Sequence, residues 1–341
     1  MKKKLRVMML THHYMVPPDD LSGPDDPRME TCRTEVDVRQ ALLELGHEVE
    51  ILGLDDDVSP LREMIENWQP DIAFNLMEAF AENGALSYYV VSFLDMMRVP
   101  YTGCNPRGLL LASDKIISKK LLTYHRIRVP KFFTIKRDRK INLSKISKFP
   151  YPMIIKSAIE QGSIGISQSS YVSTPEELID RAEKLFTMVD GDAIAEQYID
   201  GRELYVTVIG NQRLQVLPTR ELIFDSIDEK MHRIATYSVK WNRKYRDRWG
   251  IDYQFARNLP SSVQDSIPKI AKRVYRILEI SSYARLDLRL APDGKLYVLE
   301  ANPNAAISQE DDVAFSAERA GLTYNKLIQR LLSLGMQQKQ K

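Results

Sequence analysis

The chain has 341 residues, and its 48 lysine and arginine side chains nearly balance 46 aspartate and glutamate side chains, leaving a formal net charge of +2. This length can form two or three lobes around a sizeable core, and the near balance gives no bulk charge that would favour nucleic acid. The two cysteines exclude a disulfide framework, and no apolar run of about eighteen residues predicts a membrane span, so we expect a cytoplasmic protein.

Strands and helices alternate over the N-terminal part of the chain. The expected elements are strand 5–10, helix 31–46, strand 49–54, helix 60–67, strand 72–76 and helix 85–97. The first apolar run is too short for the core of a signal peptide and fits a strand better. The alternation predicts a parallel sheet with right-handed crossovers. No G-x-G-x-x-G follows the first strand, so a dinucleotide-binding loop is not expected in this Rossmann-like lobe.

A second lobe is expected from Ser113, where a helix begins with Lys115 in its first turn. A lysine is unfavourable there for the helix dipole, so it either serves an anionic ligand or is a simple solvated side chain. Residues 131–148 are basic and irregular, which is typical of a solvated surface. They lack the interleaved aromatic side chains on which nucleic-acid bases stack.

The next segment combines a strand, a lysine and a loop of small residues. Residues 153–155 predict a strand that ends at Lys156, and Gly162, Ser163 and Gly165 follow. Small residues let backbone N–H groups approach a phosphate closely, and the lysine adds a positive charge. A Walker A sequence is absent, and an ordinary hairpin with two glycines would fit the same pattern.

Further along, Thr174 and Glu177 form a capping box that predicts a helix over 175–188. Residues 193–210 predict two strands about a turn, with Glu196 and Glu203 either in a site or on an exposed edge. Residues 220–258 are dense in charged and aromatic side chains and predict a long loop, a common form of active-site lid. An amphipathic helix is expected over 261–279, packed under the hairpin that follows.

The segment 285–304 carries the strongest pattern. Residues 285–290 alternate as a half-buried strand, and Asp293-Gly294 is typical of a two-residue hairpin turn. Counting outward from that turn pairs Pro292 with Lys295, Arg289 with Val298, Asp287 with Glu300, and Arg285 with Asn302.

Two carboxylates that face each other repel, and a divalent cation would reverse this effect. The hard oxygen ligands of Asp287, Glu300 and Asn302 favour Mg²⁺ over zinc, and Arg285 beside them suits a developing anion. A solvent-exposed hairpin with scattered charges is the alternative.

Arg-x-Asp at 285–287, followed after twelve residues by Glu-x-Asn at 300–302, resembles the magnesium signature of ATP-grasp ligases. The continuation resembles the D-alanine–D-alanine ligase branch, and the similarity covers roughly residues 30–330. It implies an α/β ATP-grasp fold with an N-terminal Rossmann-like lobe and two α+β lobes. The expected lobes are residues 1–112, 113–190 and 191–335.

The resemblance also implies roles for individual residues. Asp287, Glu300 and Asn302 would hold Mg²⁺, in two ions, with Mn²⁺ as a substitute, and Arg285 would stabilise an oxyanion. Glu35 would bind the amine of a first substrate, although it also fits an ordinary helix-dipole partner. The residues implied for ATP are Lys115, Lys156, Gly162, Ser163, Glu196, Gln197, Ile199, Glu203 and Lys240. Lys240-Trp241 resembles the Lys-Tyr of a flexible loop that closes on the γ-phosphate.

Two departures bear on the substrates. Asn75 stands where the family has a histidine, and Asp311-Asp312 stand where a Ser-Leu pair binds the carboxylate of the second substrate. A carboxylate would repel that group. Either the second substrate lacks a carboxylate at this point, for example by presenting an amine, or the loop faces elsewhere.

We therefore expect an ATP-dependent carboxylate–amine ligase that acts through an acyl phosphate on small molecules, without a nucleic-acid or membrane partner. A homodimer is expected from the family alone. A non-catalytic ATP-binding regulatory protein is the alternative. A protein that binds nucleic acid through residues 131–148 and the aromatic loop is a third class, against which the near-neutral charge argues.

Overall fold

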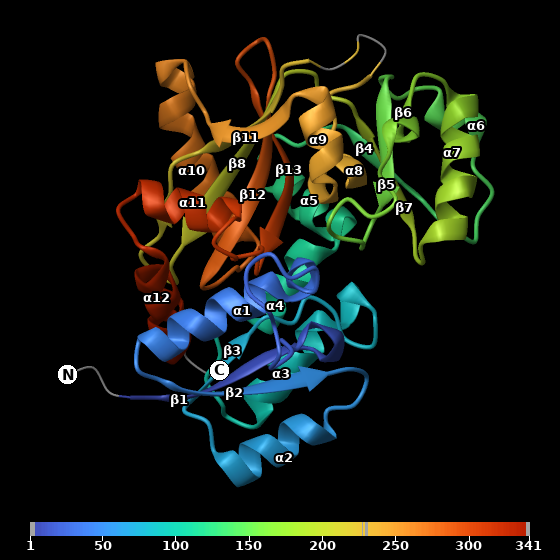
Figure 1. Cartoon of the computed structure of the whole chain (residues 1–341). Coiled ribbons are helices and arrows are strands. Elements are labelled where there is room, and N and C mark those ends of the chain that lie inside the picture. Colours follow the sequence, from blue (N-terminus) through green and yellow to red (C-terminus); the bar gives the residue numbers. More distant parts are fainter. Residues whose placement is uncertain (1–3, 227, 229–230, 339–341) are drawn as a thin grey trace.

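The computed structural model describes residues 4–226, 228 and 231–338, which form three sheets with helices packed around them (Figure 1). The sheets follow one another along the chain, from three strands at the N-terminus through four in the middle to six at the C-terminal end. Both cysteines are buried and free. None of the described helices has both the length and the apolar character needed to cross a bilayer.

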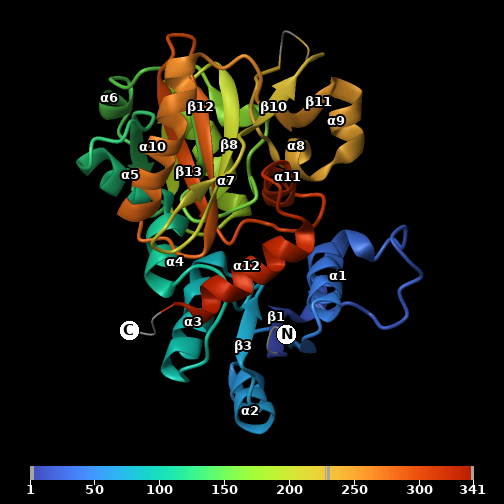
Figure 2. The ribbon, with the colours of Figure 1, turned by 90° about the vertical axis from the view of Figure 1, so that its left-hand side faces the viewer.

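The N-terminal sheet is parallel, as the alternating pattern predicts, with the order β2-β1-β3. Its strands are β1 (Arg6–His12), β2 (Glu48–Leu54) and β3 (Ile72–Asn75), and its helices are α1 (Met29–Glu44), α2 (Ser59–Trp68) and α3 (Ser87–Met96). Short 3-10 helices cover His13–Met15 (η1) and Gly84–Leu86 (η2), so the predicted helix 85–97 begins as a 3-10 turn. The C-terminal helix α12 (Tyr324–Met336) returns to pack its apolar face against this sheet and α1 (Figure 2).

Two helices connect this lobe to the rest of the molecule. They are α4 (Pro106–Ser113) and α5 (Lys115–Tyr124), and Asp114 between them caps α5 by accepting hydrogen bonds from the N–H groups of Ile116 and Ile117. The largest apolar core runs from β1 and α3 through α4 to the C-terminal sheet. Lys115 therefore begins a helix that is anchored in the core of the molecule.

The central sheet has the order β4-β7-β5-β6 and is antiparallel throughout. Its strands are β4 (Phe132–Ile135), β5 (Met153–Ser157), β6 (Tyr171–Val172) and β7 (Ala193–Gln197), and η3 (Gln168–Ser170), α6 (Leu143–Ile146) and α7 (Pro175–Met188) accompany them. The prediction that residues 131–148 are irregular is wrong, because β4 lies there and pairs with β7. Helix α7 has the predicted limits, but Glu177 accepts from the N–H of Ser173 rather than completing a capping box with Thr174.

The C-terminal sheet has the order β11-β10-β8-β12-β13, with β9 beside β8. Its strands are β8 (Arg202–Ile209), β9 (Gln215–Val216), β10 (Arg220–Phe224), β11 (Ile251–Phe255), β12 (Tyr283–Leu290) and β13 (Leu296–Pro303). The helices are α8 (Tyr237–Trp241), α9 (Arg243–Trp249), α10 (Ser261–Ile277) and α11 (Asp312–Arg319). The expectation of a long loop over 220–258 is wrong, because two paired strands and two helices occupy most of it. Helix α10 packs under the β12–β13 hairpin, as predicted.

Strands β7 and β8 are adjacent in sequence but belong to different sheets, whereas the sequence predicts two strands about one turn. The chain crosses between the sheets at Gly201, whose φ of +123° only glycine adopts readily. A Cβ atom at this position would lie 2.1 Å from the carbonyl oxygen of Leu290. This crossing places Glu196 and Glu203 in facing sheets.

The β12–β13 hairpin has the predicted register at its far end and a different one near its turn. Asp287 pairs with Glu300 and Arg285 with Asn302, but Arg289 pairs with Tyr297 rather than Val298. The turn contains three residues, since the N–H of Ala291 donates to the carbonyl of Lys295, and Gly294 has a φ of +80°.

A β-bulge between Asp287 and Leu288 then leaves Leu299 without a partner and restores the predicted register. The correct carboxylate pairing thus arises from two compensating irregularities.

We expect Gly201→Ala to lower the free energy of unfolding by roughly 3 kcal/mol, because it combines backbone strain with a clash against Leu290. Gly294→Ala is the matched control. It also has a positive φ, but no atom lies within 4 Å of its Cβ position, so about 1 kcal/mol is expected. Urea unfolding followed by circular dichroism measures both losses. Equal losses would show that the close approach at the crossing is unimportant.

Candidate functional site

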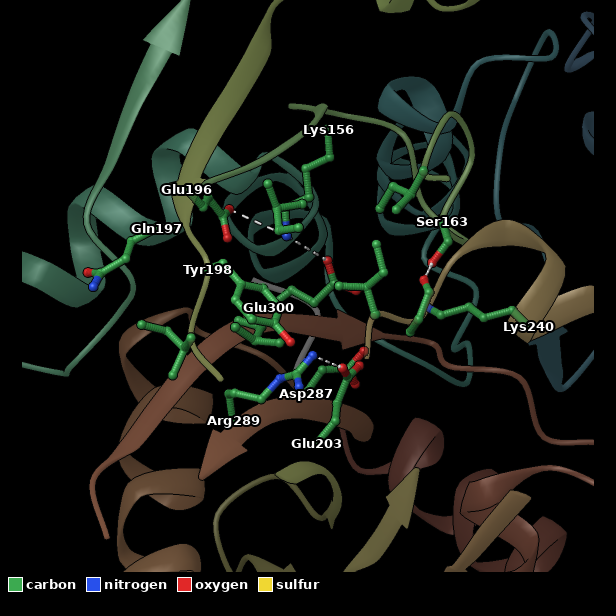
Figure 3. Close-up of a pocket in the computed structure, with 16 residues that line it drawn as sticks. Lys156, Ser163, Glu196, Gln197, Tyr198, Glu203, Lys240, Asp287, Arg289 and Glu300 are labelled. Carbon is green, nitrogen blue, oxygen red and sulfur yellow. Dashed lines mark hydrogen bonds and ion pairs between the residues drawn. The ribbon is translucent and has the colours of Figure 1, made fainter. Parts of the chain in front are cut away.

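The central and C-terminal sheets face each other across a pocket of about 630 Å³ (Figure 3). Strands β5 and β7 supply one wall, and β8, β12 and β13 supply the other. Charged side chains point into the space between them, where Lys156 and Glu196 approach Glu300 from the opposite sheet. Carboxylate and ammonium groups withdrawn from water in this way need partners across the pocket.

A buried network of charges joins the two sheets. Glu196 is 3% exposed, and its Oε1 lies 3.2 Å from Nζ of Lys119 and 3.4 Å from Nζ of Lys156. Lys156 also lies 3.8 Å from Oε2 of Glu300. Burial acts against the charge of Lys156, but Glu196 and Glu300 outweigh it and raise the pKa of Lys156. The lysine therefore stays positively charged, as a contact to an anion requires.

Lys115 lies beside this network in a recess that also includes Lys156, Gly162, Ser163 and Glu300. Its Nζ donates to the carbonyl of Glu160. Burial lowers the pKa of Lys115 to about 8, although Glu300 opposes the shift. A buried cation without a carboxylate in hydrogen-bonding contact would gain from an anionic ligand in the recess.

The loop of small residues, 162–165, is held by hydrogen bonds to the segment that follows β10. Ser163 Oγ donates to the carbonyl of Ala235 at 2.7 Å, and Trp241 Nε1 donates to the carbonyl of Gly162 at 2.8 Å. Gly162 and Ser163 both have a φ of +62°, which turns the backbone back on itself. Trp241, which follows Lys240, thus joins the segment after β10 to this loop through its indole N–H.

At the other end of the pocket, Glu203 is engaged by two side chains. Its Oε2 accepts from Arg289 Nη2 at 2.7 Å, and its Oε1 accepts from the hydroxyl of Tyr205 at 2.9 Å. Arg289 also donates to the carbonyls of Gly201 and Arg233. Glu203 is 5% exposed, so the alternative of turn-flanking acids on an exposed edge is wrong.

The two carboxylates that face each other in the β12–β13 hairpin, Asp287 and Glu300, line the first pocket. Burial raises the pKa of Asp287 to about 6, and Glu300 adds to the shift while Arg285 opposes it. Burial also disfavours the charge of Glu300, yet Lys156 and Lys115 hold the pKa of Glu300 well below its usual range. Asp287 is 3% exposed, which excludes the alternative of a solvent-exposed hairpin.

These residues fit a magnesium ion that takes its other ligands from phosphate. Asp287 and Glu300 face each other, and the buried Nδ2 of Asn302 has no hydrogen-bond partner among the described residues, so its amide is free to turn its oxygen inward. In the described part of the chain, no three acidic, histidine or cysteine side chains gather as a metal cage. Mg²⁺ commonly uses one or two carboxylates together with phosphate oxygens.

A second and larger cleft, of about 1310 Å³, adjoins the first pocket beyond Lys240. Arg285 lies at its edge and donates to both carboxylate oxygens of Asp287, at 2.8 and 3.1 Å. Asp312 lies 2.6 Å from Nε of Arg220 and 3.8 Å from Nη1 of Arg285. Asp312, which the sequence suggested would repel a substrate carboxylate, is thus neutralised by Arg220 and Arg285.

Another part of the cleft wall carries acidic side chains without ion pairs among the described residues. Glu78 is an exposed residue that faces the cleft, where partial loss of hydration, followed by the charges of Glu35 and Asp311, raises the pKa of Glu78 above its usual range. Asp311 accepts from the N–H of Ser308, and Glu35 accepts from the hydroxyl of Thr11. Glu35 is buried behind the wall and is not a lining residue of either cavity.

Most of the residues expected from the sequence therefore converge. The first pocket is lined by Lys156, Ser163, Glu196, Gln197, Ile199, Glu203, Lys240, Asp287 and Glu300. The second cleft is lined by Gly162, Lys240, Arg285 and Asn302. Sequence reasoning missed Lys119, Arg289 and Glu78. Lys119 lies one helical turn after Lys115, and Arg289 follows Arg285 and Asp287 on alternate positions of one strand, so side-chain periodicity alone pointed to both.

Comparison with known proteins identifies the C-terminal part of the chain. A family model described as D-ala D-ala ligase C-terminus matches residues 121–333. An uncharacterized protein of Sinorhizobium fredii, y4sG, is 28% identical over 86% of this chain and 84% of its own length. D-alanine–D-alanine ligase A of Bacillus cereus is 27% identical over 78% of this chain and 81% of its own length.

A solved structure extends the comparison to the whole fold. D-alanine–D-alanine ligase from Bacillus anthracis, complexed with ATP, has a TM-score of 0.74 and 21% identity, and the match covers 97% of both chains. The ATP-grasp fold expected from the sequence is confirmed by this similarity.

We expect Arg289→Met to lower the free energy of unfolding by about 3–5 kcal/mol, because Glu203 is left as a buried carboxylate without its cation. Lys184→Met is the control. It removes the cation of the ion pair with Asp180, in which both side chains are 64% exposed, and should change stability little. Urea unfolding at pH 7 measures both, and similar losses in the two variants would contradict the prediction.

Proposed function

The chain belongs to the family described as D-ala D-ala ligase C-terminus, and from this premise we propose that it is an ADP-forming ligase that joins a carboxylate to an amine through an acyl phosphate. The arrangement of the two cavities carries this proposal. A pocket suited to a nucleotide, with lysines and paired carboxylates at its floor, opens beside Lys240 and Arg285 into a cleft large enough for two small substrates.

We assign ATP to the first pocket with its base and its phosphates at opposite ends. The base would lie against Gln197 and Ile199 at the end of β7, and the phosphates would point toward Lys156 and the recess of Lys115. Glu203 would accept from the ribose hydroxyls. It already accepts from Arg289 and Tyr205, but a carboxylate has about four acceptor positions, so two remain for the sugar.

Asp287, Glu300 and Asn302 would hold Mg²⁺, most simply as two ions, with Mn²⁺ as a substitute. When bound, the metal would neutralise the phosphate oxygens during phosphoryl transfer. Lys240 lines both cavities, so it would contact the phosphoryl group on its way from the nucleotide to the substrate carboxylate.

Arg285 would stabilise the oxyanion that forms when the amine attacks the acyl phosphate. Asp287 and Asp312 hold its guanidinium from two sides, and it lies over the ring of Tyr205 at 4.9 Å. A donor held in place before the reaction stabilises developing charge without reorganisation, and losing one typically costs about 3–4 kcal/mol of barrier.

The cleft favours an amine-bearing group over a carboxylate on the wall formed by Glu78 and Asp311. Neither residue has an ion pair among the described residues, and the buried Glu35 adds negative charge near Glu78. Glu78 is thus the better candidate for direct contact with a substrate amine, and Glu35 supports it. The dependence on ATP favours the cytoplasm as the compartment, and a homodimer remains an expectation from the family.

The test is magnesium-dependent ADP release with pools of D-amino acids, L-amino acids and amines. Release should depend on the pool, and Asp287→Ala should lower the rate by roughly 100-fold or more because a metal ligand is lost. Asp293→Ala is the matched control, since Asp293 lies exposed in the turn of the same hairpin, where it forms an ion pair with the exposed Lys295.

ATP binding without turnover under every pool would favour the non-catalytic regulatory alternative. Absence of ATP binding would overturn the assignment of the pocket.

A pH titration tests Lys115. Because the pKa of Lys115 is about 8, the ammonium group of Lys115 loses its positive charge above pH 8 in the free protein. A phosphate is attracted to the charged ammonium group and not to the neutral amine. Affinity for metal-free ADP should change little between about pH 7, where the terminal phosphate of ADP is ionised, and pH 8, and above pH 8 it should fall by up to about tenfold per pH unit. Lys115→Arg stays charged over the same range and should flatten the profile. Calorimetry measures the affinities, and an unchanged slope in the variant would exclude Lys115 as its source.

A further inference from the structure

Lys119 is a buried cation that the proposed function leaves without a role. It lies on α5, one turn beyond Lys115, and is 1% exposed. Its Nζ donates to the carbonyl of Leu299 at 2.6 Å and lies 3.2 Å from Oε1 of Glu196. The ammonium group therefore joins a helix to both sheets. Burying a lysine costs free energy, whereas an apolar side chain of similar length would pack at this position without that cost.

The carbonyl that Lys119 binds belongs to the bulged residue of β13. Leu299 is the residue left over where Asp287 pairs with Glu300 and Leu288 with Val298. Side chains alternate between the faces of a strand, so without the bulge Asp287 would face Leu299, and Glu300 would point to the opposite face. The bulge thus brings Glu300 to the face of Asp287.

An extra residue in a strand leaves its backbone groups outside the normal ladder, and they need another partner. The N–H of the preceding residue, Val298, donates outward to the carbonyl of Arg128. The carbonyl of Leu299 accepts from Lys119. Lys119 therefore donates a hydrogen bond to the backbone carbonyl of the residue at which the register changes.

We propose that Lys119 is a positioning residue for the magnesium site, which holds the bulge at Leu299 and thereby keeps Glu300 opposite Asp287. The inference rests on the proposed function, because it concerns the metal pair of that site. Lys119 does not itself contact metal or nucleotide in this assignment. Its effect passes through the backbone to the carboxylate of the next residue.

The test separates metal binding from nucleotide binding. In wild type, ADP with EDTA should raise the thermal unfolding temperature, and Mg²⁺ should raise it further. Lys119→Met keeps the length of the side chain but lacks the ammonium group. Because Lys119 also pairs with Glu196 in the nucleotide pocket, the comparison is made at saturating ADP. Under that condition the variant should need roughly 10–100-fold more Mg²⁺ for the additional increase, as is typical when a residue supporting a metal ligand is lost.

Lys120→Met is the matched control, because Lys120 is the next residue on the same helix and is exposed. Its dependence on Mg²⁺ should equal that of wild type. Glu300→Gln supplies a coupling test. If Lys119 acts through Glu300, adding Lys119→Met to Glu300→Gln should shift the Mg²⁺ requirement little further, whereas independent roles would give additive shifts. The half-saturating Mg²⁺ concentration for ADP release provides a second measure.

An unchanged Mg²⁺ requirement in Lys119→Met, or additive shifts in the double variant, would overturn the proposal. If Lys119→Met does not fold, Lys119→Leu, which also lacks a donor for the carbonyl, is compared in the same way. Failure of both to fold would assign Lys119 a structural role instead. Absence of any ADP effect in wild type would count against the proposed function before Lys119 is considered.

Discussion

The site depends on the repulsion between Asp287 and Glu300, two carboxylates that face each other in adjacent strands. Without metal, Arg285 stabilises Asp287 from the same strand, and Lys156 approaches Glu300 from the facing sheet. The cations that make the carboxylate pair tolerable therefore come from both sides of the pocket. The contact between Lys156 and Glu300 also joins the two sheets across the pocket.

The path of the chain explains why these groups meet. At Gly201 the backbone passes from the central to the C-terminal sheet within a few residues, so Glu196 and Glu203 lie on opposite walls. Each is paired with a cation that also binds backbone carbonyls, Lys119 at Leu299 and Arg289 at Gly201 and Arg233. The buried charges thus organise backbone irregularities as well as side chains.

In the larger cleft, the acidic residue Asp312 is compensated by neighbouring arginines. Asp312 forms ion pairs with Arg220 and Arg285, so its carboxylate helps to hold Arg285 in the lining of this cleft. The negative charge that remains unpaired among the described residues lies elsewhere in the cleft, on Glu78 and Asp311. The repulsion expected of the Asp311-Asp312 pair therefore applies to one of the two residues. The acidic side chains without ion pairs, Glu78 and Asp311, are consistent with the proposal that a substrate amine lies beside them.

The sequence by itself determined the parallel N-terminal sheet and the helices predicted over 175–188 and 261–279, because side-chain periodicity is a local property. The pairing of Asp287 with Glu300 was predicted correctly, but from a two-residue turn that the structure does not have. Only the tertiary structure decided that β7 and β8 lie in different sheets, that residues 220–258 are mostly ordered elements, and that a bulge at Leu299 compensates a three-residue turn. Strand partners and the burial of Lys119 depend on contacts between segments far apart in the chain, which no local pattern records.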